Sequence, residues 1–285
     1  MGNGIAHTFA QTGFKVNLVD VSQEALDRGI KTITTNLDRI IAKGNLTEEQ
    51  KAETLGNITT FTALSDACGN AELIVEAATE NQDLKLKIFK QMDELAPENC
   101  ILATNTSSIS ITKIAAATKR PEKVIGMHFM NPVPIMKLVE IIKGYSTSKE
   151  TFDAIFEMSK TLGKVPVEVN DYPGFVANRI LMPMINEAIE TLYNGVAGVE
   201  EIDTVMKLGM AHPMGPLQLA DFIGLDVCLA ILNVMYDGFK NPKYAPNPLL
   251  VNMVTAGKLG VKSGEGFYDY SESKKAEKVA KIFAK

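Results

Sequence analysis

The chain has 285 residues, of which 46% are hydrophobic and 22% charged, a composition typical of a globular protein long enough for two domains. Its net charge of −5 and the lack of a basic block argue against a nucleic-acid partner, and no apolar run is long enough to span a bilayer. Cys68, Cys100 and Cys228 have the spacing of neither a metal site nor a disulfide framework. We therefore expect buried free thiols, no metal and a cytoplasmic location.

The first half of the chain alternates helices and strands. Ser22 is placed to cap a long helix, and Thr47 to Gln50 form a capping box that opens a second one. Helices are expected over residues 5–10, 22–41 and 84–95 and from residue 47 on, and strands over residues 14–19, 58–61, 73–75 and 101–103. This alternation predicts a parallel sheet covered by helices on both faces.

The pattern changes after Asp171. A strand expected over residues 165–169 is followed by Tyr172, Pro173 and Gly174, which predict a turn and a domain boundary. Helical spacing then dominates in five segments, residues 175–193, 199–208, 217–222, 225–239 and 249–256. A Lys-rich tail over residues 274–285 is most simply a solvated helix. We therefore predict an α/β domain over residues 1–172 and an all-helical domain over residues 173–285.

One segment places an imidazole opposite a carboxylate. Residues 124–128 and 136–140 predict two strands, and if these pair antiparallel about Pro134, His128 faces Glu140. Directly opposed Cβ atoms lie about 4.5–5.5 Å apart, close enough for a hydrogen bond between the side chains. Such a carboxylate fixes the histidine tautomer, as a general base requires. From this segment alone, a strand histidine and a rim glutamate without chemistry explain the pattern equally well.

The start of the chain carries half of a dinucleotide-binding fingerprint. Gly2 can be the third glycine of Gly-x-Gly-x-x-Gly, and Asp20 ends the following strand. A carboxylate there can accept hydrogen bonds from the adenosine ribose and would repel a 2′-phosphate, so NAD is favoured over NADP. A glycine-containing turn followed by a solvated acid explains the same residues as well.

No strand precedes Gly2. The first strand of a doubly wound sheet is central, and its loss would leave two neighbouring strands without a ladder partner and the phosphate-binding turn incomplete. We therefore expect an N-terminally truncated Rossmann-like domain, with weak NAD binding and poor solubility.

Several motifs, in order along the chain, resemble the L-3-hydroxyacyl-CoA dehydrogenases, and among them most closely the bacterial 3-hydroxybutyryl-CoA dehydrogenases. These motifs are Gly2, Asp20 and residues 105–108, 128–140, 171–179, 212–216 and 264–268. The resemblance covers essentially the whole chain and departs from the family at the absent first strand and first two glycines. It implies a Rossmann-like NAD-binding domain followed by an all-helical dimerisation and substrate domain.

The resemblance implies catalytic roles for five residues. His128 would be the catalytic base and Glu140 its orienting partner. Ser107 and Asn178 would hydrogen-bond the 3-oxygen of the substrate and the catalytic histidine, and Asn131 would line the same pocket. Taken alone, Ser107 and Asn178 are more typical of helix caps.

The resemblance also implies NAD as the cofactor. Its contacts would come from six residues of the first domain: Gly2, Asp20, Glu80, Lys85, Asn105 and Ser107. Asn105 would lie near the nicotinamide, with Glu80 and Lys85 on the ribose and nicotinamide side. Glu80 is equally explained as a solvated acid at the start of a helix with Lys85 on the surface, and Glu76 could instead be the inward-facing acid.

The function implied is NAD-dependent oxidation of a short-chain (3S)-3-hydroxyacyl-CoA to the 3-oxoacyl-CoA, or the reverse reduction of acetoacetyl-CoA, in fatty acid or butanoate metabolism. One alternative is a dehydrogenase of a 3-hydroxydicarboxylyl-CoA or a related hydroxy acid, and another is a non-catalytic binding or structural relative. The CoA is expected near residues 36–53. The long apolar helices over residues 180–192 and 227–235 predict a homodimer through residues 175–285.

Overall fold

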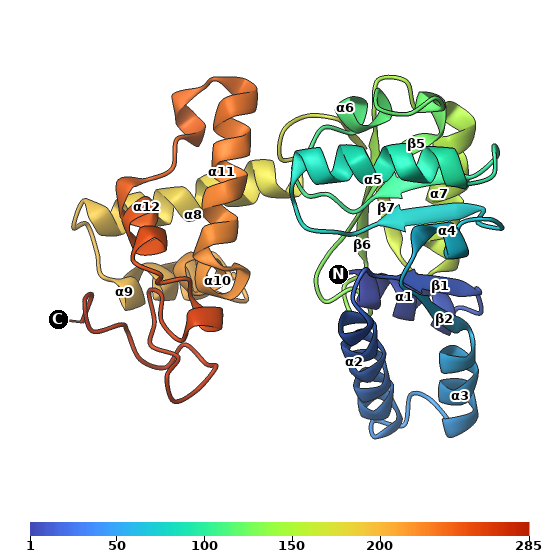
Figure 1. The fold of residues 1–285 in the computed structure, drawn as a ribbon. Helices are drawn as coiled ribbons and strands as arrows, with labels where there is room; N and C mark the ends of the chain where they lie inside the picture. Colours follow the sequence, from blue (N-terminus) through green and yellow to red (C-terminus); the bar gives the residue numbers. More distant parts are fainter. Residues whose placement is uncertain (285) are drawn as a thin grey trace. The chain divides into compact units, whose positions relative to one another are not determined.

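The computed structural model describes residues 1–284, and the chain divides into two compact units, Met1–Tyr172 (unit 1) and Pro173–Lys285 (unit 2). Unit 1 contains β-sheets with flanking helices, and unit 2 is built mainly from helices (Figure 1). The predicted fold class, an α/β unit followed by a helical one, is confirmed. Among the described residues no single helix is long and apolar enough to cross a membrane. The helices α10 (Pro216–Ile223) and α11 (Leu225–Phe239) pass that test only as a pair, and they are bent by 95° relative to each other.

Unit 1 contains seven strands and seven α-helices. The strands are β1 (Val16–Val19), β2 (Ile58–Phe61), β3 (Leu73–Glu76), β4 (Ile101–Thr104), β5 (Val124–Phe129), β6 (Leu138–Lys143) and β7 (Val165–Asn170). The helices are α1 (Gly2–Gln11), α2 (Gln23–Ile41), α3 (Glu48–Gly56), α4 (Leu64–Ala67), α5 (Gln82–Leu95), α6 (Ile111–Ala115) and α7 (Lys149–Thr161).

The strands of unit 1 form two sheets. β1 pairs only with β2, and the five-stranded sheet has the order β3-β4-β5-β6-β7. The parallel pairing predicted for the first strands is confirmed within each sheet, since β1 pairs parallel with β2 and β3 with β4. The predicted antiparallel pairing of β5 with β6, which a short turn joins, is also confirmed, while β4–β5 and β6–β7 are parallel. Within the described residues β1 and β3 are both edge strands, as expected for two strands that lack a ladder partner between them.

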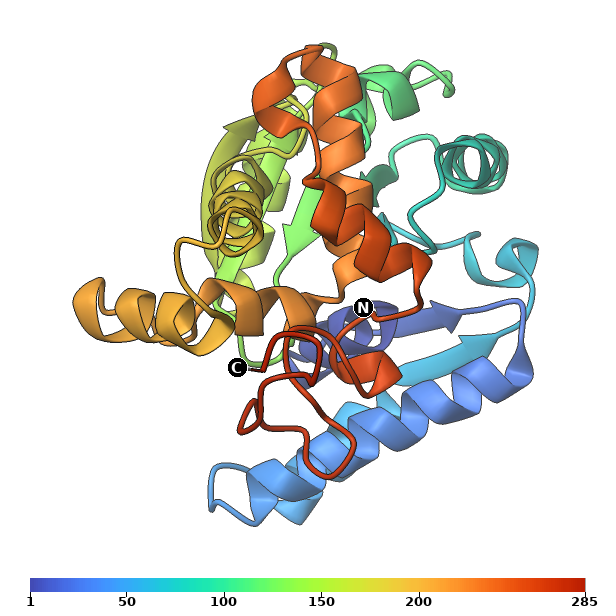
Figure 2. The same cartoon turned by 90° about the vertical axis from the view of Figure 1, so that its left-hand side faces the viewer.

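Local capping explains where α2 and α3 begin. The Ser22 hydroxyl accepts a hydrogen bond from the Ala25 N–H at the start of α2, and Thr47 and Gln50 form both bonds of the predicted capping box at the start of α3. α1 ends just before Gly13, whose φ of +93° lies in the region that favours glycine. The hairpin of α2 and α3 projects away from the five-stranded sheet (Figures 1 and 2).

Unit 2 packs five α-helices around one apolar core. They are α8 (Ala177–Tyr193), α9 (Val199–Thr204), which continues as a π-helical turn over Val205–Gly209, α10 (Pro216–Ile223), α11 (Leu225–Phe239) and α12 (Pro248–Thr255). The prediction of a helical tail is wrong for residues 274–284. Ala280 N–H donates to Phe267 O and Asp269 N–H to Lys278 O, so this segment pairs with the preceding one. Ala280 is fully buried, which the lysine content of the tail did not indicate.

Two buried carboxylates hold the C-terminal segment of unit 2. Asp203 accepts hydrogen bonds from the Leu217 N–H at the start of α10 and from the Tyr268 hydroxyl, at 2.9 and 2.8 Å. Asp221 accepts hydrogen bonds from the backbone N–H groups of Phe267 and Tyr268 at 3.0 and 2.9 Å. Both carboxylates are almost fully buried, so this cluster joins α9 and α10 to residues 267–270 inside the core.

Candidate active site

The predicted pairing of His128 with Glu140 is confirmed by the register of β5 and β6. The two residues are directly opposed, and His128 Nδ1 lies 2.8 Å from Glu140 Oε2. His128 is 8% exposed and Glu140 2% exposed. A carboxylate at Nδ1 favours the tautomer that carries its proton there, so the neutral ring presents Nε2 as its basic nitrogen. The pair therefore has the arrangement of a general base and its orienting partner.

Gly126 allows β5 and β6 to lie close together two residues before His128. It stands opposite Ile142 in the ladder, and a Cβ at this position would lie 2.8 Å from the Ile142 Cβ and 2.9 Å from Ile111 Cδ1. These distances are shorter than a packed carbon contact, so a larger residue here would force the strands or α6 to shift.

Asn105 links the ends of three neighbouring strands. It follows β4 directly, and its own N–H donates to Glu76 O at the end of β3 over 2.7 Å. Its side-chain Oδ1 accepts a hydrogen bond of 2.8 Å from Phe129 N–H, one residue after His128. Asn105 therefore lies at the carboxyl end of β4, where ligands of α/β sheets bind, and its side chain also holds the end of β5.

Glu80 binds the loop that contains Ser107. Its Oε1 accepts hydrogen bonds from Ser107 N–H at 3.0 Å and from Ser108 N–H at 3.1 Å, and also from the Thr106 hydroxyl. Burial raises the pKa of Glu80, but the hydrogen bonds from this loop and the charge of Lys85 outweigh burial and hold the pKa below its ordinary value. The interpretation of Glu80 as merely a solvated acid is therefore wrong.

Glu76 and Lys85 form a buried ion pair beneath this loop. Lys85 is 1% exposed and Glu76 5% exposed, and Lys85 Nζ lies 2.8 and 3.0 Å from the two carboxylate oxygens. Lys85 is therefore not a surface residue, and Glu76 is the inward-facing acid that the sequence left as an alternative. The sequence pattern gave no signal for the contact between them, because they lie on different elements.

The two ends of the nucleotide fingerprint have the features that NAD requires. α1 begins at Gly2 with no side-chain cap at Met1 and no acidic residue in its first turn, so the amides there suit a phosphate. Asp20 lies at the end of β1 with an exposed carboxylate, which suits ribose hydroxyls. Among residues 1–284 no group of His, Cys, Asp and Glu side chains is placed to hold a metal ion.

The two asparagines predicted for the substrate pocket belong to different units of the chain. Asn131 is exposed on the turn between β5 and β6, three residues after His128. Asn178 is the second residue of α8 in unit 2 and is 8% exposed. In unit 1, direct contacts join His128 to Glu140, Ser107 to Glu80 and Glu80 to Lys85, and Asn105 contacts the residue after His128. Asn178 belongs to unit 2.

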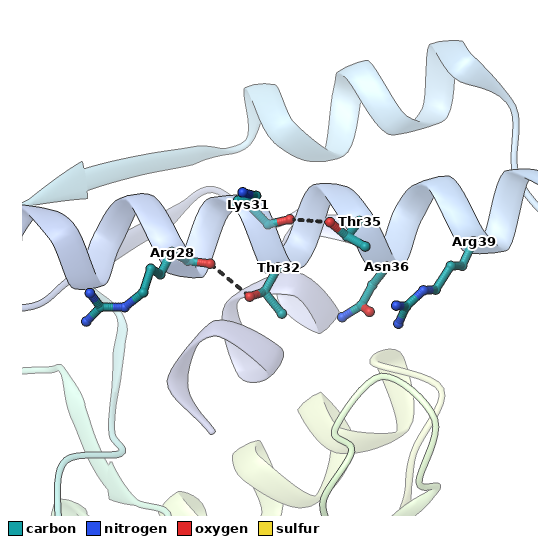
Figure 3. A pocket seen from close by; sticks show the side chains of 6 residues that line it. All are labelled: Arg28, Lys31, Thr32, Thr35, Asn36 and Arg39. Atoms are coloured by element: carbon teal, nitrogen blue, oxygen red, sulfur yellow. Dashed lines mark hydrogen bonds between the residues drawn. The ribbon is translucent and has the colours of Figure 1, made fainter. Parts of the chain in front are cut away.

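A hollow along α2 is lined by basic and polar side chains. Its volume is ≈ 360 Å³, and its lining consists of Arg28, Lys31, Thr32, Thr35, Asn36 and Arg39. Figure 3 shows the two guanidinium groups at opposite ends of this row. Arg28 also forms an exposed ion pair with Glu24 at 3.7 Å. The CoA region expected from the sequence begins only at residue 36, although the recurrence of basic residues on one face of α2 would have indicated the earlier residues as well.

Two family descriptions match the chain. Residues 1–172 match the "3-hydroxyacyl-CoA dehydrogenase, NAD binding domain", and residues 174–270 match the "3-hydroxyacyl-CoA dehydrogenase, C-terminal domain". The chain is 53% identical over 272 residues to the probable 3-hydroxybutyryl-CoA dehydrogenase of Bacillus subtilis, covering 95% of this chain and 94% of that protein. It is 54% identical to the 3-hydroxybutyryl-CoA dehydrogenase of Clostridioides difficile, with 95% and 96% covered.

A solved structure agrees with these sequence matches. The crystal structure of (S)-3-hydroxybutyryl-CoA dehydrogenase from Ralstonia eutropha has a TM-score of 0.92 and 53% identity to this chain, over 95% of this chain and 96% of that one. The resemblance predicted from the sequence is thereby confirmed. The chain belongs to the 3-hydroxyacyl-CoA dehydrogenase family, with the family's NAD-binding domain in unit 1 and its C-terminal domain in unit 2.

Proposed function

We propose that the protein is an NAD-dependent dehydrogenase that interconverts short-chain (3S)-3-hydroxyacyl-CoA and 3-oxoacyl-CoA, with acetoacetyl-CoA as the preferred oxo substrate. The observation that carries the proposal is the buried His128–Glu140 pair at the end of β5, next to the strand-end Asn105. The names of the relatives support the substrate class, since those with 53% and 54% identity are 3-hydroxybutyryl-CoA dehydrogenases.

The chemistry of the His128–Glu140 pair follows from its geometry. Oxidation of a secondary alcohol requires a base for the hydroxyl proton, and His128 Nε2 takes this role when the substrate oxygen comes within about 2.6–3.2 Å. Glu140 then faces an imidazolium and stabilises its charge. In the reverse direction the imidazolium returns the proton to the 3-oxygen. NAD, when bound, supplies the acceptor or donor of the hydride.

Other side chains polarise the oxygen and hold the substrate. Ser107 donates a hydrogen bond to the 3-oxygen, which carries more negative charge in the transition state than in the ground state. The family resemblance implies the same role for Asn178. Asn131, on the exposed turn after His128, lines the same pocket.

The cofactor side of the site combines the start of α1 with residues that follow strands β1, β3 and β4 of unit 1 and with Lys85 of α5. With NAD bound, Gly2 at the start of α1 would hold the pyrophosphate and Asp20 the adenosine ribose, while Asn105 and Ser107 would serve the nicotinamide. Glu80 contacts the cofactor from the rim of the site, and Lys85 acts from beneath Glu80, because its ammonium group is buried. A cytoplasmic location is part of the proposal and is supported by three buried free cysteines.

The test of the function is NADH oxidation with acetoacetyl-CoA, followed by absorbance. It is run on this chain and on a version extended ahead of Met1 by an apolar strand and a glycine-rich turn. The added strand is meant to pair with the edge strands β1 and β3, where Val16, Leu18 and Leu73 are only half-buried. Turnover in either protein supports the proposal. A preference for a substrate with a distal carboxylate would favour a 3-hydroxydicarboxylyl-CoA dehydrogenase, and no turnover on any substrate would favour a non-catalytic relative.

The basic hollow on α2 suits the phosphates of CoA. The double variant Lys31→Glu/Arg39→Glu should raise the KM for acetoacetyl-CoA about tenfold or more, with little change in kcat, because it replaces attraction of an anionic substrate by repulsion far from the reacting atoms. Steady-state kinetics with acetoacetyl-CoA and with acetoacetyl-pantetheine, which lacks the nucleotide phosphates, measures this effect.

Two comparisons make the α2 experiment specific. The pantetheine substrate should show no change in KM, and the control variant Lys87→Glu/Lys90→Glu, a charge reversal on the exposed face of α5, should leave both substrates unaffected. Equal KM values for acetoacetyl-CoA in the wild type and the α2 variant would show that CoA binds elsewhere.

A homodimer through unit 2 completes the proposal. Within this unit Leu208 is 82% exposed, Ile180 69% and Phe222 64%, although all three are large apolar side chains. Light scattering at micromolar concentration should give twice the chain mass of 31.0 kDa, and Leu208→Asp/Phe222→Asp should lower it toward the monomer, whereas Lys274→Asp on the polar tail should not. A monomeric wild type would contradict the proposal.

A further inference from the structure

Glu76 is a buried carboxylate beneath the candidate site, and both of its oxygens accept hydrogen bonds. It ends β3, and its Oε1 accepts from Lys85 Nζ at 2.8 Å and from Ala78 N–H at 2.6 Å. Its Oε2 accepts from Lys85 Nζ at 3.0 Å and from the Thr104 hydroxyl at 2.8 Å. Glu76 is 5% exposed, so it has no route to substrate or cofactor of its own.

Lys85 joins Glu76 to Glu80. Its ammonium group also donates to Ala78 O at 3.2 Å and lies 3.5 Å from Glu80 Oε2. The ammonium is therefore shared between two carboxylates, of which Glu76 is the closer. A buried ammonium cannot remain without acceptors, so losing one partner strengthens its attraction to the other.

Glu80 in turn holds the loop of Ser107 through its other oxygen. Oε1 accepts from Ser107 N–H, from the Ser107 hydroxyl at 3.3 Å, and from both the N–H and the hydroxyl of Ser108 at 3.1 and 3.0 Å. Thr104 gives a second connection, because its hydroxyl oxygen also accepts from Thr106 N–H at 3.2 Å. One end of the Glu80 carboxylate thus faces Lys85 and the other end faces the loop.

We propose that Glu76 is a positioning residue for Ser107, acting through Lys85 and Glu80. The role of Ser107 in turnover rests on the proposed function, whereas the mechanical link depends only on these contacts. In Glu76→Gln a neutral amide of similar shape offers one acceptor oxygen in place of two. The Lys85 ammonium then draws nearer to Glu80, and the Glu80 carboxylate is pulled away from the backbone amides of the loop.

Hydrogen exchange tests the link without any assay of activity. In Glu76→Gln the amides of residues 106–109 should exchange faster than in the wild type, because two of them lose their acceptor on Glu80. The matched control is Asp93→Asn, which breaks another buried carboxylate contact of α5, the 2.8 Å pair with Arg120. Asp93→Asn should deprotect residues 119–120 and leave 106–109 unchanged. Unchanged protection of 106–109 in Glu76→Gln overturns the proposal.

A double-mutant cycle tests the consequence for turnover of acetoacetyl-CoA. Glu76→Gln should lower kcat about 10–100-fold with little change in the KM for acetoacetyl-CoA, since a misplaced donor acts mainly in the transition state. In a Ser107→Ala background the same substitution should change kcat by less than about threefold. If the two substitutions lower kcat by independent factors that multiply in the double variant, Glu76 acts by another route and the proposal is overturned. A wild type without turnover would instead contradict the proposed function, and the exchange experiment would still decide the role of Glu76.

Discussion

Replacing His128 by Asn should lower kcat for acetoacetyl-CoA reduction about 10³-fold, which corresponds to about 4 kcal/mol of transition-state stabilisation. The asparagine side chain can still hydrogen-bond Glu140, so the β5–β6 ladder is kept, but it neither accepts nor delivers a proton near neutral pH. The KM for acetoacetyl-CoA should change little, because the phosphates of CoA bind at the hollow on α2 in our proposal. Steady-state measurement of NADH oxidation gives both constants.

His212 in unit 2 provides the control for this experiment. It lies outside the helices, just before Pro213, and His212→Asn should leave kcat and KM unchanged. Glu140→Gln should give an intermediate loss, because the amide can orient the imidazole but does not stabilise the imidazolium that forms in the reaction. Unchanged turnover in His128→Asn would falsify the assignment of the base.

Features that depend on short sequence segments were predicted well. The caps at Ser22 and Thr47 involve residues within one helical turn, so their hydrogen bonds follow from local spacing. The register of His128 with Glu140 follows for the same reason, because a short turn between two apolar strands leaves few possible pairings. The positions of the strand-end residues Asp20 and Asn105 also follow from where the strands stop.

Features that depend on contacts between distant segments were not predicted. The tail after Lys274 has the composition of a solvated helix, but its backbone pairs with residues 267–269 and buries Ala280, contacts that composition does not report. The Glu76–Lys85 pair joins β3 to α5, and Glu76 was predicted only as an alternative to Glu80. The position of Asn178 on α8 was predicted, whereas its chemical role came from the family resemblance and not from the pattern of residues.

The carboxylate cluster of unit 2 should make this unit less stable as the pH rises from about 5 to 8. Burial raises the pKa of Asp221 to about 7, and this effect exceeds the opposing one of the hydrogen bonds from Tyr268, Phe267 and Tyr270. The folded state therefore holds a proton that the unfolded chain, with an ordinary aspartate pKa, has already released. Its stabilising contribution is complete below the unfolded pKa and is lost as the pH rises through about 7. Burial also raises the pKa of Asp203, which acts in the same direction.

Between pH 5.5 and 8 the loss from Asp221 amounts to about 2 kcal/mol, or roughly 5–10 °C in the melting midpoint of a domain of about a hundred residues. Calorimetry should show this fall in the midpoint of the thermal transition that includes unit 2. That transition is the one whose midpoint changes in Asp221→Asn. The asparagine side chain in this variant has no titrating proton, so the decrease in stability with pH should shrink to the smaller part contributed by Asp203.

The control is Asp237→Asn, which changes an exposed aspartate paired with Lys240 and should keep the full decrease in stability. If Asp221→Asn kept the wild-type pH dependence, Asp221 would not be the group whose proton stabilises the fold. The expectation follows from the chemistry of its site: among residues 1–284 the hydrogen bonds to Asp221 come from neutral donors, and the charge of the neighbouring Asp203 adds to the effect of burial.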